Sequence, residues 1–230
     1  MSAILDSSIR AVYFDAVGTL LFPATSVAET YRTIAQRRGA ELHADLIRIR
    51  LREAFEQQEQ IDLGAGWRTS EVREELRWRT IVHEALREVA DTDACFRDLW
   101  ECYRWPKAWT VQSETAIVLE NLTQRGIVIG MASNFDARLA GLVAGIPELT
   151  PLADRCIISS LVGWRKPSGE FFGKVIEEAD CAAAEILFIG DDLRNDVQGA
   201  QRAGLRALLF DPAGKSEIAE RIGRLMEVVA

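Results

Sequence analysis

The sequence predicts an α/β protein with a doubly wound, mainly parallel, five-stranded sheet core and an inserted all-helical unit. Two observations predict this class. Short apolar runs alternate along the chain with amphipathic stretches, as expected of buried strands whose sheet has helices on both faces. The stretch 24–105 breaks this alternation, because it has helical periodicity and no strand pattern. We therefore expect 24–105 to be an insertion after the first strand.

Five apolar runs are expected to form the strands of the sheet: 11–14, 127–131, 156–158, 186–189 and 207–210. Each run is apolar throughout rather than alternating, which is typical of strands that are covered on both faces. Four further stretches have helical spacing, and Gly126 and Gly204 act as stop signals for two of them. These expected core helices are 113–125, 134–143 or 136–143, 168–178 and 195–203.

The insertion is expected to hold four amphipathic helices, at 26–38, 43–60, 70–90 and 92–104. Gly64-Ala65-Gly66 separates the second of these helices from the third. The predicted domains are therefore a core made of 1–23 and 106–230, and a helical domain made of 24–105. Most of the tryptophans in the helical domain are expected in its own small core.

The composition excludes several kinds of partner. A nucleic-acid partner is not expected at a net charge of −8, because nucleic-acid binders usually present a basic face. The sequence has no apolar run near the ~20 residues that span a bilayer, and it does not begin with the apolar segment of a signal peptide. We therefore expect a cytoplasmic protein with no membrane partner, whose 4 cysteines are free thiols. The oligomeric state stays open, with a monomer as the favoured state.

Polar residues follow the first three expected strands at their carboxyl ends, where ligands bind in open α/β sheets. Asp15 follows the first strand, and a carboxylate there can act as a nucleophile or a metal ligand. Ser133 and Asn134 follow the second, beside a helix start that can hold a phosphate oxygen. Lys166 follows the third and can reach an anion as a point charge. Each residue alone also fits a simpler interpretation as a helix cap or a surface side chain.

Three carboxylates crowd the end of the fourth strand, on Asp191, Asp192 and Asp196. Such crowding of like charges is unfavourable unless a cation shares the site. Hard carboxylate oxygens suit Mg²⁺, which usually takes one or two carboxylates and keeps several waters. The alternative, an acidic turn that caps a helix, needs only one carboxylate. The sequence therefore predicts a Mg²⁺ site at the same edge of the sheet as Asp15.

Taken together, these residues resemble the four motifs of the haloacid dehalogenase superfamily, a large group that consists mostly of phosphatases. The matching strings are Asp15-x-Val17-Gly18-Thr19, Ser133, Lys166-Pro167, and Gly190-Asp191 with Asp196. The resemblance covers the whole chain, and 24–105 stands where that superfamily places its helical type-1 cap. Two longer strings resemble a subgroup of uncharacterised hydrolase-like members: Ser133-Asn134-Phe135-Asp136-x-Arg138-Leu139 and Gly163-Trp164-x-Lys166-Pro167.

The resemblance implies a Mg²⁺-dependent hydrolase of a small phosphorylated molecule. Asp15 would be the nucleophile that forms an aspartyl-phosphate, and Ser133 and Lys166 would be catalytic residues that hold phosphoryl oxygens. The metal would be held by Asp15, the backbone carbonyl of Val17, and Asp191, with Asp196 orienting the metal site and Asp192 joining it through a water. The cap would supply specificity by closing over the sheet edge.

Four residues are expected to contact the substrate. Ala16 and Asn134 stand beside the first two motifs. Trp67 and Arg68 follow the glycines of the Gly64-Ala65-Gly66 break, where Trp67 could stack on the substrate and Arg68 could bind an anion. The alternative for this loop is that it only links two helices and that Trp67 packs inside the cap.

Val17 departs from the phosphatase pattern. Phosphatases of this superfamily usually have an Asp there, which protonates the leaving oxygen and later activates water. General acid–base help is worth about 10²–10⁴ in rate. Its absence leaves four hypotheses open: a leaving group that departs unaided, a proton donor from the cap, a slow phosphatase, or a binding protein without turnover.

Two relatives that also lack this Asp define further alternatives. The 2-haloacid dehalogenases use no metal, so the acidic cluster at 191–196 favours a phosphatase over them, although the string Phe14-Asp15-Ala16 keeps them as an alternative. Phosphonoacetaldehyde hydrolases use a cap lysine. The stretch 24–105 contains no lysine, which argues against that reaction.

Overall fold

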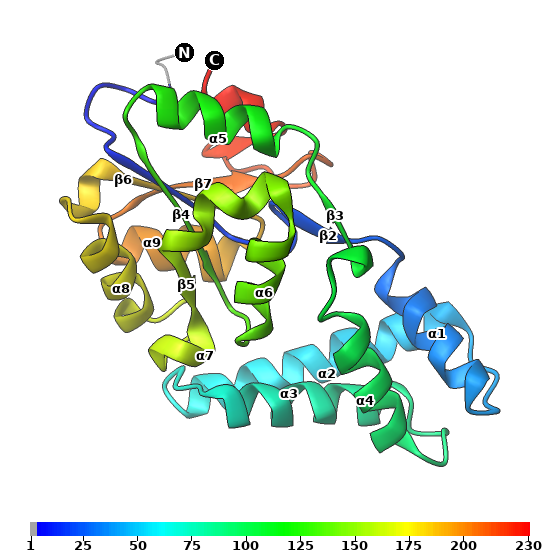
Figure 1. Ribbon diagram of the computed structural model, residues 1–230. Coiled ribbons are helices and arrows are strands. Elements are labelled where there is room, and N and C mark those ends of the chain that lie inside the picture. The colour runs from blue at the N-terminus through cyan, green and yellow to red at the C-terminus, as the bar shows by residue number, and fades with distance from the viewer. Residues whose placement is uncertain (1–3) are drawn as a thin grey trace.

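The computed structural model describes residues 4–230, and its centre is a six-stranded parallel sheet with the strand order β5-β4-β1-β6-β7-β8 (Figure 1). The strands are β1 (Ala11–Phe14), β4 (Val128–Ser133), β5 (Cys156–Ile158), β6 (Ile186–Gly190), β7 (Arg206–Phe210) and β8 (Arg221–Ile222). The prediction of a doubly wound parallel α/β core is confirmed. The predicted count of five strands is too low, because β8 has only 2 residues and therefore no apolar run.

Helices cover both faces of this sheet. The α-helices of the core are α5 (Thr115–Gln124), α6 (Arg138–Gly145), α7 (Ser159–Val162), α8 (Gly169–Ala179) and α9 (Gly199–Arg202). Other helical segments are η1 (Pro106–Ala108), which leads into β3, and η2 (Pro147–Arg155), η3 (Ala183–Glu185), η4 (Leu193–Gln198) and η5 (Leu225–Val228). α5, α6 and η5 pack on one face, and α8 and α9 pack on the other. The helix expected at 195–203 is instead the π-helical turn η4 followed by the short α9.

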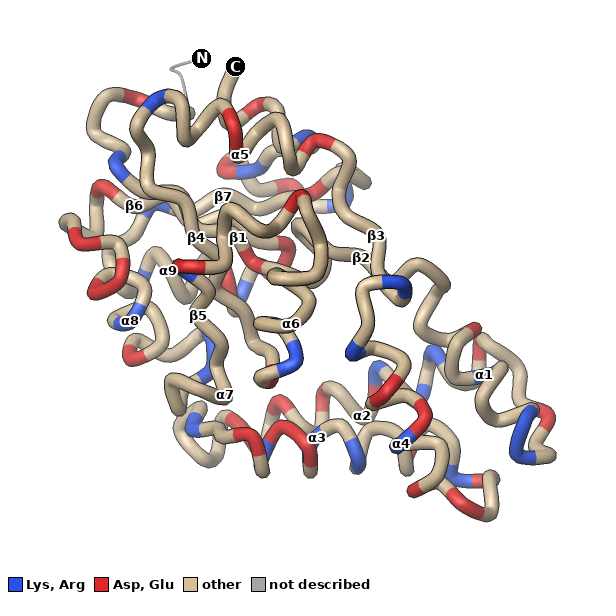
Figure 2. Tube along the Cα trace, viewed as in Figure 1, with Lys and Arg blue, Asp and Glu red and all other residues tan. Residues whose placement is uncertain are grey.

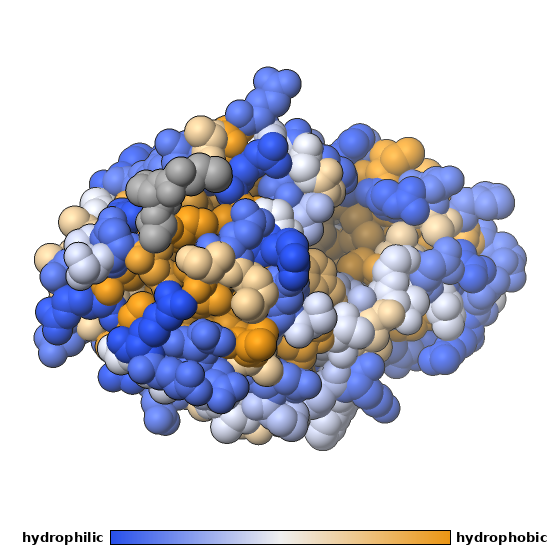
Figure 3. Space-filling view, turned by 90° about the horizontal axis from the view of Figure 1, so that it is seen from above, coloured by the Kyte–Doolittle hydropathy of each residue, from blue (hydrophilic) through white to orange (hydrophobic). Residues whose placement is uncertain are grey.

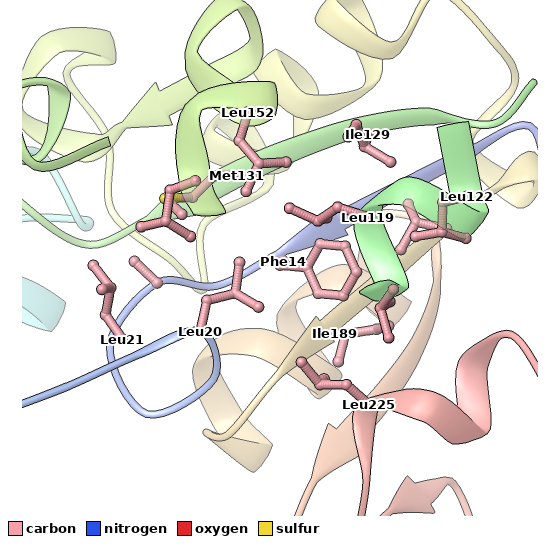
Figure 4. Packing of buried hydrophobic residues seen from close by; sticks show 14 of the residues in the cluster. Phe14, Leu20, Leu21, Leu119, Leu122, Ile129, Met131, Leu152, Ile189 and Leu225 are labelled. Carbon is pink, nitrogen blue, oxygen red and sulfur yellow. The ribbon is translucent and has the colours of Figure 1, made fainter. Parts of the chain in front are cut away.

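β1 shows why the strands of this sheet are continuous apolar runs in the sequence. All four of its side chains are fully buried. Val12 and Phe14 point into the core under α5, whereas Ala11 and Tyr13 point into the core under α8. Figure 4 shows Phe14 among side chains of α5, β6 and η5. Because successive side chains of a strand alternate between the faces, a strand with two covered faces must be apolar at every position.

The inserted segment forms four helices: α1 (Val27–Arg37), α2 (Ala44–Gly64), α3 (Glu71–Ala85) and α4 (Thr92–Cys102). They pack around a hydrophobic cluster of their own, apart from the two clusters of the sheet (Figure 1). Side chains of Ser26, Ser70 and Asp91 cap the starts of α1, α3 and α4. α3 ends earlier than residue 90, because Leu86 and Val89 fill the same apolar cluster from a turn.

A second, antiparallel sheet of two strands joins the helical insert to the core. β2 (Leu21–Pro23) pairs with β3 (Trp109–Val111), so the two chain crossings lie side by side (Figure 1). Strands of 3 residues have no readable pattern, and the sequence did not predict this pair. Among residues 4–230, no helix is long and apolar enough to cross a bilayer.

Two glycine-to-alanine substitutions are expected to change stability in opposite directions. A Cβ on Gly130 in β4 would lie 2.3 Å from the ring of Tyr13 on the neighbouring strand, so Gly130→Ala should lower the free energy of unfolding by about 1–3 kcal/mol. Gly141 in α6 is exposed and has open space around it, so Gly141→Ala should raise stability by up to about 1 kcal/mol. Urea titration measures both changes. Equal effects of the two substitutions would contradict this packing of β1 against β4.

Candidate active site

Asp15 lies at the carboxyl end of the central strand β1. Its backbone N–H donates to the carbonyl of Ile189 at 2.8 Å, which continues the pairing of β1 with β6 by one residue. The chain then turns sharply at Gly18, whose φ is +97°. A Cβ on Gly18 would lie 2.2 Å from a carboxylate oxygen of Asp191. A glycine at this position therefore permits both the turn after Asp15 and the close approach of Asp191.

Lys166 connects two buried carboxylates. Its Nζ donates to Oδ1 of Asp15 and to Oδ1 of Asp196, each at 2.6 Å, and its side chain is only 2 % exposed. Burial alone would lower the pKa of Lys166, but attraction and hydrogen bonds from Asp15 and Asp196 outweigh burial and raise that pKa. The lysine is therefore a fixed positive charge beside the predicted nucleophile.

Asn134 holds the backbone of Lys166. Its Oδ1 accepts from the N–H of Lys166 at 2.8 Å, and its Nδ2 donates to the carbonyl of Lys166 at 3.0 Å. Ser133, the last residue of β4, is buried and lines the same cavity as Asp15. The structure thus brings Asp15, Ser133 and Lys166 together, and it uses the amide of Asn134 to position the lysine.

Asp15, Asp191 and Asp196 form an acidic cluster in which one oxygen from each carboxylate lies within 4.8 Å of the others. Burial raises the pKa of Asp191 to about 7, and the carboxylates of Asp15 and Asp196 act in the same direction. Burial also raises the pKa of Asp196, while Lys166 opposes that shift. Carboxylate oxygens with surplus negative charge match the preference of a hard divalent cation. The donor set therefore fits Mg²⁺.

Asp192 lies outside this cluster. Its Oδ1 accepts from the backbone N–H groups of Arg194 and Asn195 at 2.8 and 2.9 Å, and its Oδ2 accepts from Nδ2 of Asn195 at 3.1 Å. Oδ1 of Asp192 therefore caps the start of η4, and Oδ2 binds the side chain of Asn195. The observed bonds give Asp192 the role of a helix cap, while its contact with the metal through a water stays a prediction.

A cavity of about 700 Å³ lies over this edge of the sheet, between the core and the helical insert. Asp15, Val17, Ser133, Lys166 and Asp191 line its core side. Aromatic and aliphatic side chains of α1–α4 line the opposite side. In the view from above, apolar residues line a recess between the larger body and the insert (Figure 3).

Trp67 and Arg68 lie at the contact between insert and core, beside the residues that line the cavity. The carbonyl of Trp67 accepts from the N–H of Arg165 at 2.9 Å. The guanidinium of Arg68 lies 4.6 Å from the ring centroid of Trp164, and that of Arg194 lies 5.1 Å from the ring of Trp67. These contacts form a clasp between the loop and the core, in which Trp67 and Arg68 contact Trp164, Arg165 and Arg194. Contact of Trp67 and Arg68 with the substrate stays a prediction. Ala16 is a packing residue, because its side chain is fully buried.

A buried ionic network lies next to this clasp, and the sequence did not predict it. Arg165, next to Lys166, donates to Glu74 of α3 and lies 3.5 Å from Asp62 of α2. Asp62 is fully buried and also accepts from Arg77 at 3.1 Å. Figure 2 shows charged residues of both signs along α2 and α3. One sequence pattern could have indicated this network. Asp62 continues the apolar stripe of α2, and a carboxylate at such a position indicates a buried charge with a partner.

The comparison with known families agrees with the fold and the four motifs. The family model for haloacid dehalogenase-like hydrolases matches residues 9–204. The chain therefore belongs to the haloacid dehalogenase-like hydrolases, and the resemblance seen in the sequence is confirmed.

Two sequence relatives and one solved structure illustrate what this chain is similar to. Haloacid dehalogenase-like hydrolase domain-containing protein 3 of Bos taurus is 26% identical over 220 residues, which are 91% of this chain and 87% of the relative. Ribulose-1,5-bisphosphate 5-phosphatase of Halopiger xanaduensis is 31% identical over 106 residues, which are 46% of this chain and 44% of the relative. The crystal structure of a dehalogenase with an intermediate complex is similar with a TM-score of 0.76, at 18% identity and 97% coverage of both chains. That last likeness shows the fold alone.

The contacts of Arg165 and Arg68 between the insert and the core predict how much each side chain stabilises the protein. Arg165→Ala would leave Glu74 and Asp62 buried with less positive charge, so the free energy of unfolding should fall by about 3–5 kcal/mol. Arg68→Ala removes an exposed guanidinium stacked on Trp164, so the loss should stay within about 1 kcal/mol. Chemical denaturation followed by circular dichroism measures both losses. Comparable losses in the two variants would contradict the burial of this network.

Proposed function

We propose that the protein is a Mg²⁺-dependent phosphohydrolase that acts on a small phosphate ester through an aspartyl-phosphate on Asp15. The observation that carries the proposal is the bridge of Lys166 between Asp15 and Asp196, beside the carboxylate of Asp191. An anionic substrate needs positive charge at this edge of the sheet, and a lysine together with a divalent cation would supply it. We place this activity in the cytoplasm.

The metal would be held by Asp15, Asp191 and the backbone carbonyl of Val17, with Asp196 orienting the site. When bound, Mg²⁺ would neutralise charge on the phosphoryl oxygens and on the surrounding carboxylates. The helical insert, residues 24–105, would act as a cap domain over the core formed by 1–23 and 106–230. Its role would be to keep water out of the site.

Asp15 performs the covalent step in this proposal. Lys166 binds Oδ1 of Asp15, so we assign the attack to Oδ2. The new bond joins Oδ2 to phosphorus while the bond from phosphorus to the leaving oxygen breaks. A water then attacks phosphorus, the bond to Oδ2 breaks, and inorganic phosphate leaves with the Asp15 carboxylate restored. Ser133 and Lys166 would hold the phosphoryl oxygens during both steps.

Val17 gives the site no general acid. Its side chain lines the cavity beside Asp15 but carries no proton donor. The leaving oxygen would therefore depart as an anion or take its proton from water. We expect slow turnover of alkyl esters and faster turnover of esters whose leaving group is already acidic.

A metal-free 2-haloacid dehalogenase is the second candidate, since a dehalogenase shares this fold. Two observations favour the phosphatase. The acidic cluster would repel a haloacid carboxylate unless a cation were bound. A ribulose-1,5-bisphosphate 5-phosphatase is also among the sequence relatives.

The proposal predicts release of phosphate from p-nitrophenyl phosphate in the presence of Mg²⁺. Excess EDTA should reduce the rate to background, and so should Asp15→Asn, because its amide is a poor nucleophile. Absorbance of p-nitrophenolate measures the rate. EDTA-insensitive hydrolysis, or full activity of the Asn variant, would contradict the proposal. Release of chloride from 2-chloropropionate without metal would favour the dehalogenase instead.

Introducing a carboxylate at position 17 should raise the rate of phosphate-ester hydrolysis. Val17→Asp would place a general acid and base beside Asp15, and we expect a gain in kcat of about 10²–10⁴ on an alkyl phosphate. The gain should be smaller on p-nitrophenyl phosphate, because its leaving group needs no proton. An unchanged ratio of the two rates would mean that the introduced carboxylate does not reach the leaving oxygen.

A further inference from the structure

The cavity over Asp15 has two chemically different ends. Its core end is polar and carries Asp15, Ser133, Lys166 and Asp191. Its other end is built by the helical insert and is largely aromatic. The aromatic wall comprises Tyr31, Phe55, Trp78, Phe96, Trp100 and Tyr103 of the insert, together with Trp109 of β3 next to the insert. A phosphoryl group at the core end would leave the rest of its molecule against this wall.

The aromatic wall is preorganised by contacts among its own members. Phe55 of α2 and Trp78 of α3 pack edge to face, with ring centroids 5.5 Å apart. Tyr103 and Trp109 pack with centroids 5.5 Å apart where the insert returns to the core. Fixed aromatic surfaces of this kind bind apolar groups, above all flat ones, with little loss of side-chain freedom.

The cationic side chains that line the cavity already have carboxylate partners. Arg77 binds Asp62, Arg138 binds Asp136, and Arg165 binds Glu74. The remaining two, Arg194 and Lys166, lie within 3.9 Å of Glu59 and 2.6 Å of Asp15. Glu56 and Glu59 add negative charge to the same lining. Among the described lining residues, only Arg194 is a cation without a hydrogen bond to a carboxylate, and the negative charge of Glu59 lies beside it. A second phosphate or a carboxylate on the substrate would therefore find little positive charge in this lining.

We infer that the substrate is a phosphate monoester that carries a large apolar group, preferably aromatic, and no second anionic group. This inference rests on the proposed function and specifies its substrate class. A cavity of about 700 Å³ holds a molecule much larger than a phosphorylated two- or three-carbon acid. Contact of an apolar group with the wall would contribute affinity in proportion to the area removed from water. A small polar ester would make no apolar contact with the aromatic wall.

The test compares alkyl monophosphates whose leaving oxygens have the same chemistry. Ethyl phosphate, 2-phenylethyl phosphate and 2-(naphthyl)ethyl phosphate all release a primary alcohol, so kcat/KM reports the apolar group rather than the leaving group. With Mg²⁺, kcat/KM should rise by at least about tenfold from the ethyl to the naphthylethyl ester. Phosphoglycolate, which carries a carboxylate, should be no better than ethyl phosphate. Equal values along the series, or a preference for phosphoglycolate, would overturn the inference.

A cap variant tests whether the wall is the source of this preference. Trp78→Ala should lower the ratio of the naphthylethyl to the ethyl kcat/KM by about tenfold, because it removes a large part of the apolar contact. Trp105→Ala is the matched control, since Trp105 is 49% exposed and bonds Glu101 on the outside of α4. Its ratio should equal that of the wild type. Trp78→Leu replaces Trp78→Ala if thermal melting shows that the latter does not fold.

Binding of inert analogues separates this inference from the proposed function. Calorimetry with Mg²⁺ compares 2-(naphthyl)ethylphosphonate with ethylphosphonate, neither of which can be hydrolysed. Tighter binding of the naphthyl compound by at least about tenfold supports the apolar wall even if no ester is turned over, in which case only the proposed hydrolysis fails. Equal affinities for the two phosphonates would overturn the inferred substrate class. Hydrolysis of ethyl phosphate would in that case still support the proposed function.

Discussion

The ammonium group of Lys166, buried between the carboxylates of Asp15 and Asp196, is the interaction on which the rest of the site depends. It joins the end of β1, the loop before α8 and the turn η4, which are far apart in the sequence. Without it, two buried carboxylates would face each other at high electrostatic cost. With it, the carboxylate of Asp191 still leaves surplus negative charge, and this is the charge that a divalent cation would balance.

Much of the site could be predicted from the sequence because its residues lie at one edge of a parallel sheet. Parallel strands bring their carboxyl ends to one edge, so residues that directly follow buried runs must meet there. Asp15, Ser133 and Asp191 were predicted from that rule, whereas Lys166 comes after β5 only beyond the short helix α7. The strands themselves were predictable because both faces of the sheet are covered, as β1 shows with side chains buried on alternate faces.

What the sequence could not predict depends on contacts that have no local pattern. β8 and the pair β2–β3 are too short to show a periodicity. Asp192 follows a strand like its neighbours, and only the observed bonds to Arg194 and Asn195 show that it caps a helix. The clasp of Arg165 with the insert is a long-range pairing whose partners are separated by 91 residues at Glu74. Spacing along the chain carries no information on such a pair.

A polar sheet edge, the buried ion pair of Arg165 with Glu74 and an aromatic wall line one cavity. Our proposal has the chemistry begin at Asp15. The most direct measurement is mass spectrometry of the enzyme, acid-quenched during turnover of a phosphate ester with Mg²⁺. A phosphoryl group should be found on the peptide that contains Asp15, and it should be absent from the Asp15→Asn variant. Turnover with no modification of Asp15, or with the phosphoryl group on another residue, would contradict the assignment of the nucleophile.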